Sequence, residues 1–204
     1  TQDLYTFHPG TGRFTPMELG GEKAKYTKRL FTDHEGNLWI VAENGVYTDK
    51  EGTVIPDDIR RATGITECPA GTIWIATEYG LWKHEKEPGT FERIDNKQIS
   101  ACNLYGIECD SQDRLWISSS EGLFSYDCTS GKVRHYSSAC GHVCTQYTVG
   151  GSGHLPDGCI AFCGVGGATV IDPAMIKEND FLPVPFLEGT SGPITVRRGQ
   201  SPFT

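Results

Sequence analysis

The sequence predicts an all-β fold built from repeated antiparallel sheets, and three observations carry this prediction. A fifteen-residue unit occurs four times, at 33–47, 68–82, 110–124 and 155–169. Each unit holds two turn positions nine residues apart, with an alternating, largely apolar stretch between them. No segment has a convincing helical period. Repeats of about 40 residues with four short strands each are typical of propeller blades, so we predict a β-propeller segment of about four and a half four-stranded antiparallel blades.

The repeated unit accounts for two strands of every blade. Its four copies are DHEGNLWIVAENGVY, CPAGTIWIATEYGLW, DSQDRLWISSSEGLF and LPDGCIAFCGVGGAT. The paired turn positions are Gly36 and Gly45, Gly71 and Gly80, Asp113 and Gly122, and Gly158 and Gly167. The first turn precedes the strand that carries the tryptophan, and the second turn leads into the next strand.

Two further strands flank each copy of the unit. The β-prone segments TKRLFT, ATGITE, LYGIEC and CTQYTV precede the copies, and a hairpin of the type LFSYDCTSGKVRHY follows. The blades are therefore expected at about 24–55, 56–95, 96–138 and 139–173. Residues 4–14 superpose on 123–133, which makes residues 1–19 the outer two strands of another blade.

The two ends of the array leave a closure problem, because an open propeller exposes strand edges and apolar blade faces. Residues 181–204 contain two β-prone pieces that could supply the missing inner strands and close a five-bladed ring. Pro183 and Pro185 remove backbone donors from such a strand. We therefore favour a partial propeller over 1–183, followed by an exit segment or closing strands at 184–204, with its edges paired in a homodimer.

The composition limits the classes of partner. The net charge of −8 and the pI near 5.2 oppose binding to nucleic acid or to an anionic membrane, because both need a positive surface. No apolar run approaches the roughly 18 residues that span a bilayer, so membrane attachment is expected only through segments outside this sequence. A neutral ligand fits better.

The three tryptophans of the unit are expected to pack in the core. Trp39, Trp74 and Trp116 alternate with aliphatic residues along strands whose two faces are covered by adjacent blades. A sugar-stacking role is the alternative for these rings, but their placement favours packing.

The second turn of each unit is a better place for ligand binding, because these turns project from a rigid array on the same face as the connections between blades. The acids, amide and aromatic ring found there suit a hydroxyl-rich ligand such as an oligosaccharide. The candidate ligand-binding residues are Glu43, Asn44, Glu78, Tyr79, Ser120 and Glu121, followed in the fourth unit by Val165 and Gly166. Solvated turn residues without a function are the alternative.

The cysteines and histidines give no clear catalytic pattern. Cys159 and Cys163 lie too far apart along a predicted strand to bridge each other. Cys140 and Cys144, with His142 and His154, could form a metal site, but buried free thiols with one disulfide at most are the favoured interpretation. No nucleophile elbow and no phosphate-binding loop is present. We predict no enzyme activity, no cofactor and no metal site.

The repeated string D-x-x-G-N-L-W-I-x-x-x-x-G-L resembles the two-component regulator propeller repeat. That repeat occurs in the extracellular sensor regions of hybrid two-component histidine kinases of gram-negative bacteria. The resemblance extends from Leu4 to about Pro183, and the stretch 166–186 resembles the end of such a propeller. Three departures occur: Cys68 replaces the turn Asp, Asp113 replaces the turn Gly, and Ala161 replaces the Trp of the fourth unit.

The resemblance implies a non-catalytic, periplasmic ligand-sensing segment. The full protein is then expected to detect a glycan or oligosaccharide, to work as a paired receptor, and to carry a histidine kinase elsewhere. A protein-interaction scaffold and a propeller lyase are the alternatives. Fold by itself does not choose among them.

Overall fold

The computed structural model describes residues 4–17, 24–50, 55–69, 71–85, 89–137, 144, 146–176, 186–188 and 195–197. The chain divides into two compact units, Thr1–Pro173 and Ala174–Thr204. Apart from one short helix, the regular structure of the described residues is antiparallel β-sheet, as predicted.

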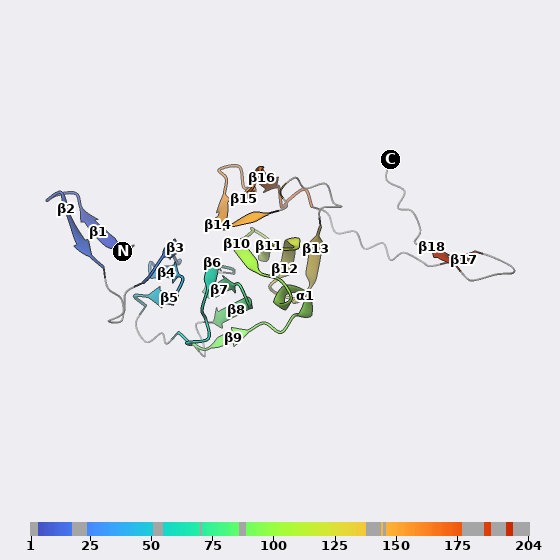
Figure 1. Cartoon of the computed structure of the whole chain (residues 1–204), viewed down its shortest axis with the longest axis horizontal. Coiled ribbons are helices and arrows are strands. Elements are labelled where there is room, and N and C mark those ends of the chain that lie inside the picture. The colour runs from blue at the N-terminus through green and yellow to red at the C-terminus, as the bar shows by residue number, and fades with distance from the viewer. Residues whose placement is uncertain are drawn as a thin grey trace. The chain divides into compact units, whose positions relative to one another are not determined.

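In the described part of the first unit, the strands form five sheets (Figure 1). A hairpin pairs β1 (Tyr5–His8) with β2 (Arg13–Pro16). We number the other four sheets in chain order. The first sheet holds β3 (Thr27–Thr32), β4 (Leu38–Ala42) and β5 (Gly45–Thr48). The second holds β6 (Ala62–Glu67), β7 (Thr72–Thr77), β8 (Gly80–Glu85) and β9 (Phe91–Arg93). The third holds β10 (Leu104–Cys109), β11 (Arg114–Ser119), β12 (Gly122–Asp127) and β13 (Val133–Tyr136); the fourth holds β14 (Tyr147–His154), β15 (Ile160–Gly164) and β16 (Gly167–Ile171).

Within the described residues, the first and fourth sheets have three strands each, where the repeat predicted four. Residues 51–54 and 177–185, which follow these sheets along the chain, lie outside the described part. In the second unit, β17 (Phe186–Glu188) and β18 (Thr195–Arg197) pair with each other in an antiparallel hairpin. Closure of the ring and pairing with a second copy stay predictions.

A short helix, α1 (Lys97–Ser100), lies between the second and third sheets along the chain. The sequence predicts no helix here, because a single turn is too short to produce a hydrophobic period. The Asn96 side chain caps the helix by accepting hydrogen bonds from the backbone N–H groups of Gln98 and Ile99. Ile99 is fully buried and anchors the turn in the core.

The repeats superpose in their hydrogen bonding as well as in their sequence. The first strand of each sheet has a register shift against its neighbour, between Thr27 and Arg29, Ala62 and Gly64, Leu104 and Gly106, and Tyr147 and Ser152. In each of these four sheets, the second turn is hydrogen-bonded to a residue one or two positions before that strand. Its first backbone N–H donates to a carbonyl: Glu43 to Lys25, Glu78 to Arg61, Ser120 to Asn103 and Val165 to Gln146.

The first strands of the sheets lie innermost, with later strands farther out (Figure 1). Glycines allow these inner strands to approach closely. A Cβ added at Gly64 on β6 would lie 3.1 Å from Ile107 Cγ2 and 3.3 Å from Ile107 N on β10. A Cβ at Gly106 would lie 2.8 Å from Ser152 Oγ on β14. Sequence analysis missed this role, because it depends on the distance between sheets and not on a turn.

Two hydrophobic clusters fill the spaces between sheets. One packs Trp39 and Val41 of the first sheet against Ile65 and Ile73 of the second. The other packs Trp74 of the second sheet against residues of the third, among them Ile107. Trp39, Trp74 and Trp116 have exposed fractions of 0%, 1% and 0%. Each of these rings is therefore core and out of reach of a ligand in solution.

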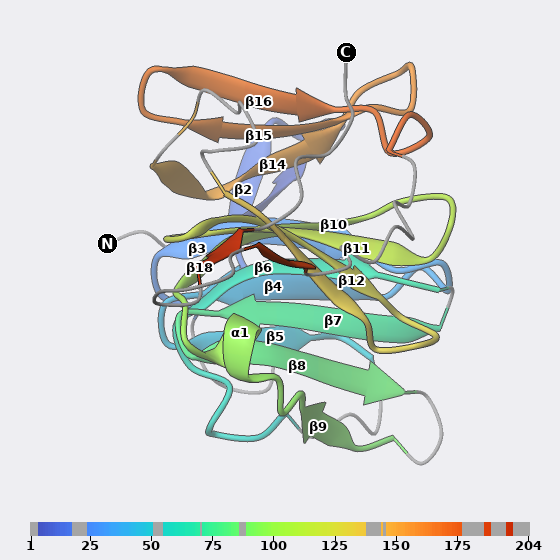
Figure 2. The same cartoon turned by 90° about the vertical axis from the view of Figure 1, so that its right-hand side faces the viewer.

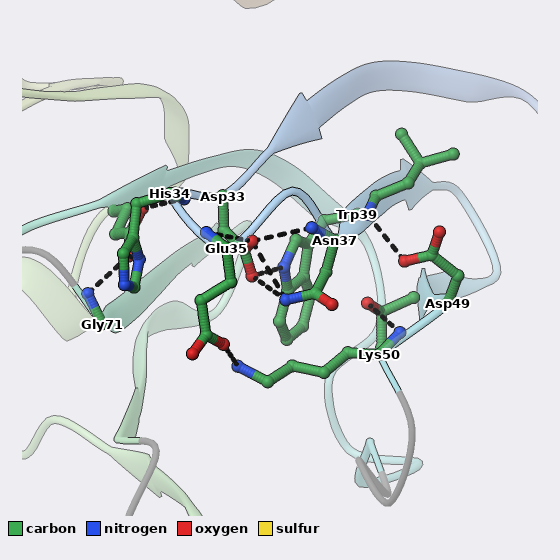
Figure 3. Close-up of polar contacts among 11 residues, drawn as sticks. Asp33, His34, Glu35, Asn37, Trp39, Asp49, Lys50 and Gly71 are labelled. Atoms are coloured by element: carbon green, nitrogen blue, oxygen red, sulfur yellow. Dashed lines mark hydrogen bonds and ion pairs between the residues drawn. The ribbon is translucent and has the colours of Figure 1, made fainter.

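The Asp and the Trp of the repeated unit are joined by a side-chain hydrogen bond in the first and third sheets. Trp39 Nε1 donates to Asp33 Oδ2 over 3.0 Å, and Trp116 Nε1 donates to Asp110 Oδ2 over 2.8 Å. The other oxygen of Asp33 accepts from the backbone N–H groups of Glu35 and Asn37 and closes the turn (Figure 3). The motif therefore holds the tryptophan and the turn together through one buried carboxylate.

The backbone conformation explains why glycine occupies the first turn position. The first turn position has φ between +88° and +90° at Gly36, Gly71 and Gly158. Asp113 replaces this glycine with φ +57°, a left-handed conformation that Asp tolerates better than most residues. In the second unit, where Cys68 replaces Asp, the Trp74 N–H donates to the carbonyl of Cys68 instead.

Acid should weaken the hydrogen bonds that the Asp33 carboxylate accepts. Burial raises the pKa of this carboxyl, but hydrogen bonds from Trp39 and Asn37 and the charge of Lys50 outweigh it and lower the pKa overall. The stabilisation is therefore complete above the unfolded-state pKa and is lost as pH falls through the lower folded-state pKa. We expect Asp33→Asn to cost about 1–3 kcal/mol of unfolding free energy at neutral pH.

Urea unfolding from neutral to acid pH measures this effect. The difference between wild type and Asp33→Asn should shrink as pH falls, because only the wild type loses an ionised carboxylate. Asp58→Asn, at an exposed position, is the matched control. A difference that stays constant over the acid range would contradict the assignment.

Candidate functional site

We define the turn face as the end of the first unit where the second strand of each sheet turns into the third. Its turns are 43–44, 78–79, 120–121 and 165–166, the positions predicted to bind a ligand. Seen after a 90° rotation, the strands run across the view, and α1 lies at the end where β7 turns into β8 (Figure 2). Gly80 is the first residue of β8. A Cβ added at Gly80 would lie 3.8 Å from Ser100 Oγ of α1.

Charged side chains link the turns of the first and second sheets. Lys28 Nζ is 2.6 Å from Glu43 Oε2 and also donates to the carbonyl of Ala62 over 3.2 Å. Arg61 Nε is 2.6 Å from Glu78 Oε2 and 4.0 Å from Glu43 Oε1. Two of the predicted residues, Glu43 and Glu78, are thus brought together by a guanidinium group that the sequence analysis did not select.

The electrostatics of this network follow from its ion pairs. The hydrogen bond and charge of Lys28, with a contribution from Arg61, lower the pKa of Glu43 although partial burial opposes the shift. The hydrogen bond and charge of Glu78 raise the pKa of Arg61. The network therefore presents carboxylate acceptors and charged donors side by side.

The outer strands hold two of the turns in place. Arg93 Nη2 of β9 donates to the carbonyl of Tyr79 over 2.5 Å, and His135 Nε2 of β13 lies 2.7 Å from the carbonyl of Glu121. The Tyr79 ring itself is 57% exposed. The backbone of the turn is thus fixed while its aromatic ring faces solvent, which suits recognition of a ligand.

The other predicted turn residues differ in how far their side chains are available to bind a ligand. Asn44 Oδ1 accepts from the backbone N–H of Lys25 over 2.9 Å, and its amide nitrogen donates to Tyr47 Oη over 2.5 Å. These bonds hold its own turn together. Ser120 and Glu121 are exposed. The structure therefore gives Asn44 a structural role and leaves Ser120 and Glu121 open to solvent.

Backbone strain marks the same face. Tyr26 and Arg61 occupy equivalent positions just before β3 and β6, with φ of +53° and +52°. A left-handed conformation costs a non-glycine residue about 1–2 kcal/mol. The Tyr26 ring is 62% exposed. Tyr26 and Arg61 are not among the predicted residues, because a left-handed residue other than Gly, Asn or Asp leaves no pattern in the sequence.

A second polar group lies where the inner strands meet, and we call its members Arg29, Glu108, Ser152 and His154 the axial cluster. Arg29 Nη1 donates to Glu108 Oε1 over 2.7 Å and to Ser152 Oγ over 3.1 Å. Ser152 Oγ donates to Glu108 Oε1 over 2.8 Å, and His154 Nε2 is 3.5 Å from Glu108 Oε2. These contacts join β3, β10 and β14. The Glu108 side chain at their centre is only 3% exposed.

A disulfide between Cys68 and Cys109 joins the second sheet to the third. Cys102, Cys128, Cys159 and Cys163 are free thiols. Cys159 and Cys163 do not bridge each other, as the strand spacing predicted. The suggested group around Cys140 and His142 lies outside the described residues. One cluster with metal-ligand spacing is present in the described part, formed by Cys68, Cys109 and Asp113.

Comparisons with known proteins bear on the fold. No family model matches the sequence. The histidine kinase P4 of Formosa agariphila is 23% identical over an alignment of 171 residues, and the match covers 76% of this chain and 12% of that protein. This chain thus spans a small part of that relative.

Among solved structures, the extracellular domain of a protein assigned as a hybrid two-component system from B. thetaiotaomicron superposes with a TM-score of 0.65 at 12% identity. The match covers 89% of this chain and 26% of that chain. A second such domain gives a TM-score of 0.57 at 19% identity, over 85% of this chain and 28% of that chain. Virginiamycin B lyase from Staphylococcus aureus gives 0.57 at 18% identity, over 97% of this chain and 63% of that chain.

These similarities agree with the strand order and the repeats described above. Within the described residues, no helix has the length and hydrophobicity needed to cross a membrane. The resemblance on which the sequence analysis relied is thus confirmed for the fold. The chain is a β-propeller segment with the architecture found in the extracellular domains of hybrid two-component systems.

Proposed function

We propose that this chain is a non-catalytic sensing segment of the extracytoplasmic part of a hybrid two-component system, and that its turn face binds a glycan or oligosaccharide. The observation that carries the proposal is the network of Lys28, Glu43, Arg61 and Glu78 beside the exposed ring of Tyr79. Paired donors and acceptors suit hydroxyl groups, and an exposed ring offers an apolar surface for a sugar face.

The rest of the signalling path follows from the same proposal. The sensor domain lies in the periplasm, and a histidine kinase elsewhere in the full protein receives the signal. A ligand changes the output only if it binds one arrangement of the paired receptor more tightly than the other. The likeness to extracellular domains of two-component systems supports this role.

Calorimetry against a panel of oligosaccharides tests the binding site. Tyr79→Ala is expected to weaken binding of the ligand about tenfold or more, because a central aromatic contact contributes about 2 kcal/mol or more. Tyr5→Ala is the matched control, since Tyr5 is 51% exposed on β1 and belongs to none of the four turns that define the turn face. Wild-type protein that binds no member of the panel, or equal binding by both variants, would contradict the proposal.

A propeller lyase is the second candidate, because virginiamycin B lyase shares the fold over almost the whole of this chain. Chromatography of the same samples separates the two functions. A sensor returns the oligosaccharide unchanged, whereas a lyase forms product with time. Binding of a partner protein and no small molecule would favour the scaffold alternative.

A further inference from the structure

Two departures from the repeated unit meet at one place in the structure. Cys68 stands where the first and third units carry the turn Asp, and Asp113 stands where the other units carry the turn Gly. The Sγ atoms of Cys68 and Cys109 and a carboxylate oxygen of Asp113 all lie within 4.8 Å of one another. Side chains from the second and third sheets therefore converge on one point.

A third sulfur joins this group. Cys128, directly after β12, has its Sγ 3.6 Å from that of Cys68. Its backbone N–H donates to the carbonyl of Asp113 over 3.1 Å, which holds the two residues side by side. We call Cys68, Cys109, Cys128 and Asp113 the thiol cluster.

The surroundings of the thiol cluster are mostly apolar. Cys68 is fully buried, and Cys109 and Cys128 are partly buried against the core between the second and third sheets. The carbonyl of Cys68 is fixed by the indole N–H of Trp74. Asp113 is exposed and leaves one side open to solvent. A buried, preorganised set of sulfurs with an entry from one side has the features of a metal site.

We propose that the thiol cluster binds one thiophilic divalent ion, such as Zn²⁺ or Cd²⁺, when the Cys68–Cys109 bond is reduced. Zinc takes Cys and Asp as ligands in a tetrahedral arrangement. With Zn–S bonds of about 2.3 Å, two sulfurs on one ion lie about 3.8 Å apart. The 3.6 Å between the sulfurs of Cys128 and Cys68 is close to that separation.

The two states of the thiol cluster exclude each other. A small dithiol supplies two electrons and two protons to the Cys68–Cys109 bond, which becomes two thiols while the dithiol becomes a cyclic disulfide. The ion then forms three bonds to sulfur and one to the Asp113 carboxylate, and three thiol protons pass to the buffer. A covalent or a coordinate link therefore joins the second and third sheets in either state.

The test titrates the whole chain with Cd²⁺ after dithiol reduction and removal of the reductant without oxygen. The thiolate-to-metal absorption band in the ultraviolet and calorimetry report binding. Reduced wild type should bind one Cd²⁺ at this site, and the oxidised protein should not. Cys128→Ser and Asp113→Gly should each weaken this binding at least about tenfold.

The variants are chosen so that the fold is kept. Asp113→Gly restores the glycine that the other units carry at this left-handed position, and Cys128→Ser leaves the disulfide partners in place. Circular dichroism of the oxidised variants checks this. Cys163→Ser, exposed on β15, is the matched control and should bind like wild type. Unchanged Cd²⁺ affinity in Cys128→Ser and Asp113→Gly, or absence of binding by reduced wild type, would overturn the proposal.

Discussion

Trp116→Ala is expected to lower the free energy of unfolding by about 3–5 kcal/mol. The ring is fully buried in the third sheet, where the Tyr136 ring lies 5.5 Å away and the Arg114 guanidinium 5.6 Å away. Truncation leaves a cavity, and it also removes the N–H donor to Asp110, a residue that is only 7% exposed. Both losses act on the folded state alone.

Urea denaturation followed by circular dichroism measures this change. Trp116→Phe keeps most of the ring volume and loses the hydrogen bond, so its cost should be smaller, at about 1–3 kcal/mol. Tyr79→Ala, at an exposed position, should stay within about 0.5 kcal/mol of wild type. If Trp116→Ala were as stable as Tyr79→Ala, the ring could not be core. The same set of variants also separates stability from binding, since Tyr79 is the residue proposed to contact the ligand.

Glu108→Ala is expected to lower the free energy of unfolding by about 3–5 kcal/mol. The change leaves the guanidinium of Arg29, 18% exposed, without its anionic partner at the junction of the inner strands. Ser152 loses the acceptor of its hydroxyl at the same time. The cost comes from an uncompensated buried charge and unpaired donors rather than from lost apolar contact.

A double-mutant cycle tests this explanation. Glu108→Leu combined with Arg29→Met removes both charges, and it should recover much of the stability lost in Glu108→Ala, because a buried ion pair can be replaced by apolar side chains at little cost. Glu92→Ala, exposed on β9, is the control for loss of a carboxylate. A loss below about 1 kcal/mol for Glu108→Ala is what a surface ion pair would give, and it would contradict the burial of the axial cluster.

The proposed functions rest on different parts of the fold. The turn face is built from turns that the repeats hold in equivalent positions, whereas the thiol cluster is built from residues that depart from the repeat. Failure of oligosaccharide binding would leave the thiol-cluster proposal standing, because the two tests share no residue and no ligand.

The elements of the fold could be predicted because their causes are local. Two turn positions nine residues apart bracket each Trp-bearing strand, and the second one has φ from +119° to +151°, where glycine is favoured. Alternation along the strand then decides which face is apolar. The candidate turns 43–44, 78–79 and 120–121 could be located for the same reason, since a turn lies where the strand pattern stops.

The partners of those turns could not be predicted in the same way. Arg61 lies between Glu43 and Glu78 because two neighbouring sheets pack side by side, and Tyr26 reaches the turn face through a strained backbone that has no sequence pattern. The short helix α1 is decided by its Asn96 cap and the burial of Ile99. The position of Arg61, the position of Tyr26 and the formation of α1 each depend on a neighbour that is distant along the chain or on a single local contact.

By itself, the sequence determined the strand content, the repeat and the positions of the turns, because hydrophobic alternation and backbone conformation act over a few residues. Only the tertiary structure decided which long-range pairs form. Arg29 meets Glu108 across 79 residues, and Cys68 meets Cys109 across 41. The physical reason is that the stacking of sheets selects such pairs in three dimensions, and distances between stacked sheets leave no periodic mark on the chain.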